Sequence, residues 1–492
     1  MSNLTRQIPG KPRFWTAAAC AVVALLGMAL ATGCSAILEL EQCTSDDDCQ
    51  EFEECNEEML CQEVERESVT SFIDEDTTWT SDTTYVLENM IFVVESTLEI
   101  EAGTQIRAKP GAGLVTRPGA KLIAEGTRDE PIVFTSDQPV GERLAGDWAG
   151  LAMIGRAPTN REDFLFRVES EDRGKPTVGG EDESYDCGTL RYVRTEFGGS
   201  EVEVEIDGET QLEQALNGIS LAGCGSETTI EYIQAHMSDD DGLAVFGGNV
   251  DIRNALVTRA QTDSFNFDTG WQGTAQYLVA QQDSGGNDAM EIQNLFEDHD
   301  AEPRANAQIY NFTLIGDPET SSQLGLKYQR GAHGLASHGI IYGHPTAGLY
   351  IESAASAQAV EDGNLVVQNT IFDNVGPGGD GYFDRIDDEY YDDEDERDAE
   401  LYNFGAYPGY EGFYDYEIFE EASLNNRFGS FADFEGDPRD LSEPGWVPSS
   451  ANTTDVGAPP EQEGFDTTGV FRGAFRPGET PWTDGWTAFP RS

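Results

Sequence analysis

Four polar residues recur at almost constant spacing in the middle of the chain. Asn217, Asp241, Asp263 and Asp288 each begin the same short phrase, and successive copies start 24, 22 and 25 residues apart. If the copies stack, these side chains form a column with a spacing of about 4.8 Å. Carboxylates this close together can share the acid, base or nucleophile roles in cleaving a glycosidic bond. Asp241, Asp263 and Asp288 are therefore candidate catalytic residues.

Two other interpretations of the column stay open. Calcium prefers oxygen ligands, and a calcium site would draw on Asp239, Asp240, Asp241, Asp263 and Asp268. Alternatively, each polar side chain bonds backbone N–H groups at its turn and forms a structural ladder, as Asn and Asp commonly do. We favour the ladder, because strand alternation gives the column the same parity as the inward-facing apolar positions. Calcium is the one cofactor that the pattern suggests.

The elements that would position this column are short stacked strands. Each phrase continues with a tiny residue and then with apolar, variable and apolar positions, and no helical period is present. A repeat of this length with alternating apolar positions predicts a β-solenoid. One inward column would be Ile219, Leu243, Phe265, Met290, Leu326 and Leu349. The outward column would be Ser220, Ala244, Asn266, Glu291, Lys327 and Tyr350.

Several segments before the repeats carry a specific resemblance. Leu98–Thr104, Gly119–Thr127, Pro131–Ser136 and Gly146–Gly150 are similar to segments of exported bacterial right-handed β-helix proteins, a pectate-lyase-like family that often consists of lipoproteins and has no settled activity. The resemblance implies an all-β, right-handed parallel β-helix, which we place over residues 73–383.

Enzymes with this kind of solenoid include pectate lyases, which suggests how such an enzyme could work. By resemblance, a lyase would use aspartates that bind Ca²⁺ together with an Arg or Lys base. The candidate bases are Arg253, Arg259, Lys327 and Arg330. None of them lies in a recognisable lyase motif, so the sequence leans away from an enzyme.

The N-terminus predicts export. Residues 1–33 have a basic start and an apolar stretch over 14–31 that is too short to favour a membrane-spanning helix. Leu30–Cys34 resembles a bacterial lipobox, which implies a signal peptide and lipidation of Cys34. Ser35 implies sorting to the outer membrane. Ordinary secretion with cleavage nearby is the alternative.

The remaining cysteines indicate disulfides. An exported chain with evenly spaced cysteines usually pairs them, and zinc is disfavoured because no close Cys-x2-Cys pair is present. Residues 34–72 would form a small acidic module held by two disulfides, and a third would close a polar insertion in the β-helix. The cysteines concerned are Cys43, Cys49, Cys55 and Cys61 in the module and Cys187 and Cys224 in the β-helix.

Charge limits the partners. The chain has 29 basic and 92 acidic residues and a net charge of −63, so it repels nucleic acid and anionic lipid headgroups. Membrane attachment would therefore be through the lipid on Cys34. Residues 384–400 are too acidic to pack and predict a disordered loop, and 401–492 predict an irregular segment that caps the solenoid.

These observations favour a lipid-anchored cell-surface protein that binds glycan or another surface protein, with a role in adhesion. A calcium-dependent polysaccharide lyase or a glycoside hydrolase is the alternative that the acidic column suggests. A passive structural protein of the cell envelope is the third possibility.

Overall fold

The computed structural model describes residues 53–55, 61–63, 65–161, 177–206, 209–320, 322–376, 419, 421–449, 453–462 and 464–491. The chain divides into two compact units, Met1–Glu63 and Val64–Ser492. In the first unit, β1 (Glu53–Cys55) and β2 (Cys61–Glu63) pair antiparallel, with Cys55 opposite Cys61. The predicted signal peptide, Cys34, Cys43, Cys49 and the acidic loop 384–400 lie outside the described residues.

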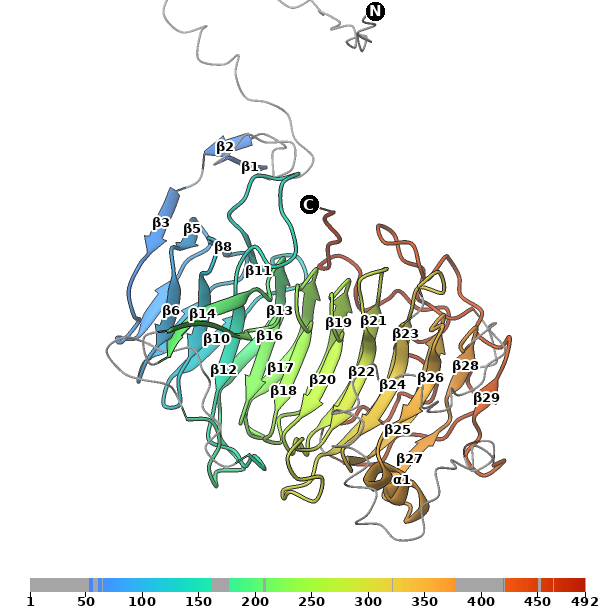
Figure 1. The fold of residues 1–492 in the computed structure, drawn as a ribbon. Coiled ribbons are helices and arrows are strands. Elements are labelled where there is room, and N and C mark those ends of the chain that lie inside the picture. The colour runs from blue at the N-terminus through green and yellow to red at the C-terminus, as the bar shows by residue number, and fades with distance from the viewer. Residues whose placement is uncertain are drawn as a thin grey trace, which may run out of the picture. The chain divides into compact units, whose positions relative to one another are not determined.

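The second unit is a parallel β-helix whose strands stack into two long parallel sheets (Figure 1). The nine-stranded sheet contains β6 (Met90–Val93), β9 (Gly113–Thr116), β12 (Gly150–Ile154), β16 (Ile219–Ala222), β18 (Leu243–Phe246), β20 (Phe265–Asp268), β22 (Asp288–Gln293), β24 (Leu324–Gln329) and β26 (Ala347–Ile351). The right-handed parallel β-helix expected from the sequence is therefore confirmed.

The sixteen-stranded sheet forms the other walls of the coil. It contains β3 (Glu65–Val69), β4 (Thr77–Trp79), β5 (Thr83–Leu87), β7 (Thr97–Ile100), β8 (Gln105–Ala108), β10 (Lys121–Glu125), β11 (Ile132–Ser136), β13 (Gly188–Glu196), β17 (Thr229–His236), β19 (Ile252–Thr258), β21 (Thr274–Gln281), β23 (Asn306–Ile315), β25 (His333–Tyr342), β27 (Leu365–Gln368), β28 (Ile371–Asp373) and β29 (Arg427–Phe428). Its first strand, β3, pairs with β5 and so lies within the stretch assigned from sequence to the Cys-rich module.

Successive turns of the sixteen-stranded sheet bend at one residue each. These residues have left-handed backbone angles, with φ between 50° and 63°. In chain order the bend column is Tyr192, Tyr232, Asn254, Tyr277, Asn311, His338 and Asn369. At this position the two segments of each wall meet, since β10 and β11 both pair with β13. His338 thus shares its position in the turn with Asn311 and Asn369.

The core follows the predicted alternation. Ile219, Leu243, Phe265, Met290 and Leu326 are in register from one strand to the next, and none is more than 1% exposed. Continuous apolar columns of this kind bury each strand against its neighbours, at roughly 25 cal/mol per Å² of apolar surface.

An insertion and a short helix interrupt the coil. The antiparallel hairpin β14 (Glu201–Ile206) and β15 (Glu209–Ala215) lies between Cys187 and Cys224, which form the predicted disulfide. The helix α1 (Ala354–Glu361) begins after Ser353, whose side chain accepts a hydrogen bond from the backbone of Ser356. Within the described part of the chain, no helix is long and apolar enough to cross a bilayer.

The C-terminal strap, which comprises the described residues 421–449, 453–462 and 464–491, covers the outer face of the sixteen-stranded sheet. That face carries the apolar side chains of Leu256, Val279 and Ile315, and they pack against Trp446 and Phe475 of the strap. The strap contains one short strand, β29, and otherwise consists of turns and irregular structure. An irregular segment therefore shields an apolar sheet face that water would otherwise reach.

Candidate functional site

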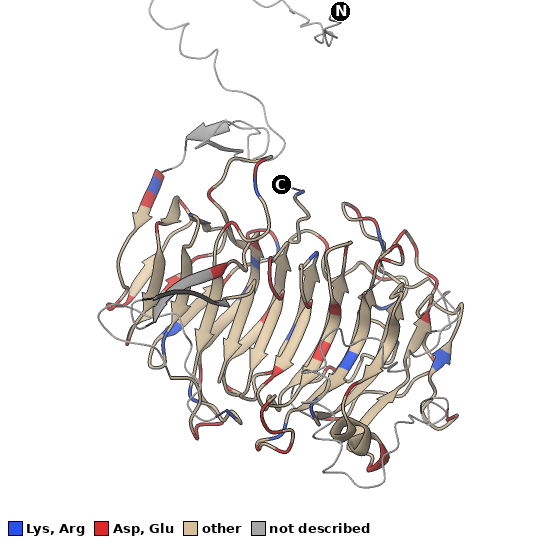
Figure 2. Ribbon diagram, viewed as in Figure 1, with Lys and Arg blue, Asp and Glu red and all other residues tan. Residues whose placement is uncertain are grey.

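The outer face of the nine-stranded sheet changes from apolar to polar along the coil. Its first rungs are apolar, because Phe92, Val115 and Ala152 pack with Val178 and Leu216. Further along, the predicted outward column continues in register through Ala244, Asn266, Glu291, Lys327 and Tyr350. The polar cluster on this face consists of Asn266, Asp288, Glu291, Gln293, Lys327, Gln329, Arg330 and Glu352. Figure 2 shows acidic and basic segments side by side where β22 and β24 cross this face.

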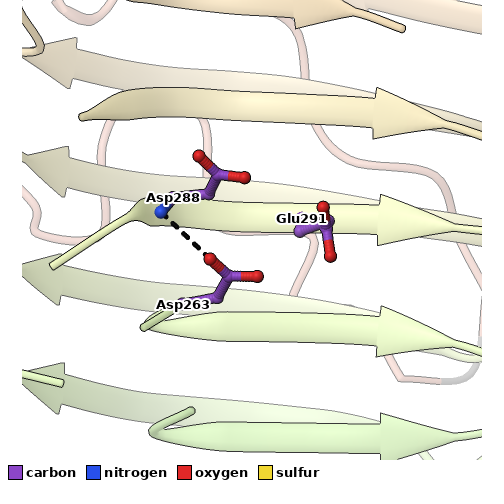
Figure 3. Close-up of side chains that lie close together, drawn as sticks. All are labelled: Asp263, Asp288 and Glu291. Atoms are coloured by element: carbon purple, nitrogen blue, oxygen red, sulfur yellow. Dashed lines mark hydrogen bonds between the residues drawn. The ribbon is translucent and has the colours of Figure 1, made fainter. Parts of the chain in front are cut away.

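The acidic column beside this cluster has a structural role at two of its turns. Oδ1 of Asp241 accepts a hydrogen bond from the backbone N–H of Asp263 at 3.1 Å, and Oδ1 of Asp263 accepts one from that of Asp288 at 3.0 Å (Figure 3). Each carboxylate therefore fixes the next turn, which confirms the ladder interpretation at these positions. Asn217 differs, because its amide donates to the hydroxyl of Ser220 at 2.9 Å.

Lys327 joins the last column member to the polar cluster. Its Nζ lies 3.0 Å from Oε1 of Glu291, 3.2 Å from Oε2 of Glu352 and 3.5 Å from Oδ2 of Asp288. Burial by itself lowers the pKa of Lys327, but the three carboxylates outweigh it and raise that pKa. The ammonium is therefore held charged as the counter-ion of a buried acidic group.

Amide side chains extend the polar cluster towards a loop. Nε2 of Gln329 donates to Glu291 at 2.5 Å and to Gln293 at 3.1 Å, and Arg330 also donates to Gln293. The guanidinium of Arg330 lies 4.8 Å from the ring centre of Phe296, whose side chain is 57% exposed. The cluster thus ends at an aromatic ring that is open to solvent.

Burial perturbs the carboxyl groups of the column. Desolvation, together with the neighbouring Asp240, raises the pKa of Asp241 to about 7. Desolvation also raises the pKa of Asp263, and the nearby Asp288 adds to this. The pKa of Asp288 rises to about 7 because burial outweighs the attraction of Lys327. Carboxyl groups tuned to this range can act as general acids, although structural burial gives the same signature.

The residues predicted to bind calcium do not all come together. Asp263, Asp288 and Glu291 place carboxylate oxygens within 4.8 Å of one another, so their donor type fits Ca²⁺. Of the predicted ligands, Asp263 alone belongs to this group. Asp240 and Asp241 accept hydrogen bonds from the hydroxyl of Thr262, at 3.0 and 2.7 Å.

The other two predicted ligands lie apart from this group. The backbone N–H of Asp239 donates to the carbonyl of Gly198 at 2.9 Å, and the side chain of Asp268 accepts from the backbone N–H of Thr269 at 2.5 Å. Glu291 is not among the calcium ligands that the sequence pattern predicts. Its signal was adjacency in the outward column to Lys327, since opposite charges on neighbouring rungs must meet.

Two of the four candidate bases lie elsewhere. Arg253 donates to the carbonyl of Gly464 in the strap, and Arg259 forms an ion pair with Asp283 at 2.8 Å. Lys327 and Arg330 lie at the polar cluster, where both are already engaged by oxygen atoms of the protein. The polar cluster therefore contains two of the four candidate bases.

The comparison with protein families agrees with this architecture. The model of a family described as a pectate-lyase like beta helix domain matches residues 71–396. The chain belongs to this family. The match spans the nine-stranded sheet with its polar cluster and all of the sixteen-stranded sheet except β3 and β29. Searches of curated proteins and of solved structures found no match.

Proposed function

We propose that this member of the pectate-lyase-like family binds polysaccharide on the outer face of its nine-stranded sheet and does not cleave it. The observation that carries the proposal is the polar cluster that ends at the exposed ring of Phe296 under Arg330. Hydroxyl groups of a sugar would meet the amides and charges, and its apolar face would lie on the aromatic ring.

Binding is favoured over cleavage because the carboxylates of this face are already engaged. Asp241 and Asp263 accept backbone hydrogen bonds, and Lys327 contacts Asp288, Glu291 and Glu352. A general acid or nucleophile needs an oxygen that can reach the substrate. Asp288 is 1% exposed, which leaves little room for such an approach.

The charge of the protein favours a neutral glycan. With 92 acidic and 29 basic residues, the surface repels polyuronates such as pectate. A neutral chain would not experience this repulsion and could lie across several rungs.

The location follows from the predicted export signal. We place the protein at the cell surface or in the outer membrane, held by a lipid on Cys34. Labelling cells with a palmitate analogue tests this: the wild type incorporates the label and Cys34→Ala does not. Equal labelling of both proteins would exclude the anchor.

A glycan array, read together with release of reducing sugar, tests the binding proposal. The wild type should bind a neutral polysaccharide and release no sugar. Phe296→Ala should weaken binding about tenfold, which is the size of one lost ring contact. Phe431→Ala is a matched control, because that ring also lies beside an arginine, with Arg427 at 5.7 Å, but belongs to the strap. Loss of binding in both variants, or in neither, would contradict the proposal.

A polysaccharide lyase or hydrolase is the second candidate, because Asp288 has a pKa near 7 beside the calcium-compatible oxygens of Asp263 and Glu291. Sugar release that requires Ca²⁺ and disappears in Asp288→Asn would establish it. Capture of a surface protein, with no glycan bound, would instead support adhesion to protein.

A further inference from the structure

The C-terminal strap satisfies the polar members of the bend column at most of its turns. The amide of Asn311 donates to the carbonyls of Gly469 and Phe471 at 3.1 and 2.6 Å. Nε2 of His338 lies 2.7 Å from the carbonyl oxygen of Gly457. The amide of Asn425 donates to Asn369 at 3.0 Å. At these turns the strap lies directly on the bend.

Asn254 departs from this pattern. Its side chain is 4% exposed, yet among the described residues its amide forms no hydrogen bond. It lines a cavity of about 320 Å³ between the sheet and the strap. Since the amide lines the cavity and has no partner in the described part of the protein, its N–H groups and carbonyl oxygen can bond a ligand with polar groups. At this turn the cavity lies between the bend and the strap.

Aromatic rings form the walls of this cavity. The bend-column neighbours of Asn254 are Tyr232 on the preceding turn and Tyr277 on the following one, and both line the cavity together with Trp482. Tyr232 stacks on Tyr192 of the turn before it, with ring centres 4.5 Å apart. Its opposite face is therefore directed towards the turn of Asn254, where a ring-shaped ligand could lie on it.

The charged groups around the cavity are balanced. Arg476 pairs with Glu479 at 3.2 Å, and the hydroxyl of Tyr277 donates to Asp466 at 2.9 Å. Arg253 also lines the cavity and donates to a strap carbonyl. Two arginines and two carboxylates leave no net charge for an ionic ligand, while their remaining lone pairs and N–H groups suit hydroxyls. Thr468, Glu479 and Thr480 are exposed and mark the opening to solvent.

We propose that this cavity is a second sugar site, which takes one neutral pyranose ring, such as the end of a glycan chain. The ring would lie on Tyr232 and its hydroxyls would bond the amide of Asn254. The volume is at the lower end of the range for ligand pockets, which fits a single ring better than an extended chain. The site lies on the sixteen-stranded sheet, so the inference stands independently of the proposed function of the other face.

Saturation-transfer NMR on the full chain, with glucose, galactose, mannose and xylose as probes, tests the proposal. At least one of them should bind the wild type and quench the fluorescence of tryptophan, since Trp482 lines the cavity. Asn254→Gly preserves the left-handed backbone and removes the amide, and it should weaken binding at least tenfold. Tyr232→Asn, a residue that the bend accepts elsewhere, should do the same.

Asn369→Gly is the matched control. It makes the same substitution in the same column, but removes hydrogen bonds to Ser337 at 3.2 Å and from Asn425 at 3.0 Å. We expect a lower melting temperature and unchanged sugar binding. The proposal is overturned if no neutral sugar binds, if indole-3-acetate or galacturonate binds better than every neutral sugar, or if Asn254→Gly binds like the wild type. Phe296→Ala, which probes the other face, should leave binding of these monosaccharides unchanged.

Discussion

Oδ1 of Asp263 lies 3.0 Å from the backbone nitrogen of Asp288, the residue that begins the next copy of the repeat. The same oxygen accepts from the amide of Asn287 at 3.2 Å. A side chain whose spacing suggested catalysis therefore holds the start of the following strand. This relationship separates two roles of Asp263 that can be tested, as a hydrogen-bond acceptor and as a charge.

Asp263→Asn and Asp263→Ala should differ in stability. The asparagine retains an oxygen that accepts from Asp288 and removes a buried charge, so the free energy of unfolding at pH 8 should stay the same or rise. The alanine leaves the N–H of Asp288 without its acceptor and should cost about 1 to 3 kcal/mol. Urea denaturation of both variants measures this. Equal losses would show that the charge of Asp263, and not its acceptor, stabilises the turn.

Stability should fall as pH rises from about 4 to about 7. Asp288 has a folded-state pKa of about 7, whereas an ordinary aspartate titrates near 3.8. In this window Asp288 keeps its proton in the folded state and has lost it in the unfolded chain. The free energy of unfolding therefore decreases as pH rises. The stabilisation is complete below pH 4 and lost above pH 7, and it amounts to at most roughly 4 kcal/mol for this group.

Asp288→Asn imitates the protonated carboxyl at every pH. It should match the wild type at pH 5 and exceed it at pH 8, because it removes a buried negative charge while Glu291 and Glu352 remain as the counter-ions of Lys327. Glu297→Gln, which changes an exposed carboxylate on the neighbouring loop, should keep the wild-type profile. A variant that follows the wild type from pH 5 to pH 8 would mean that Asp288 is ionised throughout.

Lys327→Met should be strongly destabilising. It removes the counter-ion of Asp288, Glu291 and Glu352, and loss of one partner of a buried ion pair typically costs 3–5 kcal/mol. Calcium should then restore part of the loss, since Asp263, Asp288 and Glu291 offer oxygen ligands. Thermal melts with and without millimolar CaCl₂ measure both effects, and the wild type should respond less than the variant.

Lys121→Met provides the comparison for Lys327→Met. The side chains of Lys121 and its partner Asp186 are 45% and 28% exposed, so the pair should contribute at most about 1 kcal/mol. Calcium should not change its melting temperature relative to the wild type. If both lysine variants lost equal stability, the buried cluster would not depend on Lys327 for its charge balance.

The architecture could be predicted from the sequence because each repeat of a solenoid contains its own core residues. Each copy must supply two inward apolar residues, so Leu243 and Val245 predict the positions of Phe265 and Phe267 one rung later. The sequence predicts only some members of the bend column. Asn311, His338 and Asn369 share a recognisable context, whereas Tyr232 and Tyr277 adopt the same left-handed backbone without a residue type that signals it.

The site was less predictable because its contacts join elements that are distant in the chain. Glu352 follows β26 and reaches Lys327 of β24, and Phe296 belongs to a loop that bends back over Arg330. The cavity at Asn254 depends on residues more than 200 positions away in the strap, which has no repeat to reveal its register. Periodicity places residues within a sheet, but it carries no information about what covers that sheet.

Removal of the Cys187–Cys224 disulfide should lower the free energy of unfolding of the whole β-helix, and not only that of its hairpin insertion. The bond joins residues 37 positions apart, and in the chain-entropy description a loop of this length corresponds to roughly 4 kcal/mol. Both sulfurs are buried against the core, so paired Cys→Ser substitutions would add a polar penalty and paired Cys→Ala substitutions are the cleaner test. The alanine variant should lose about 2 to 4 kcal/mol in urea denaturation. Unchanged stability would indicate that the unfolded chain is already compact around this insertion, so that the cross-link removes little of its entropy.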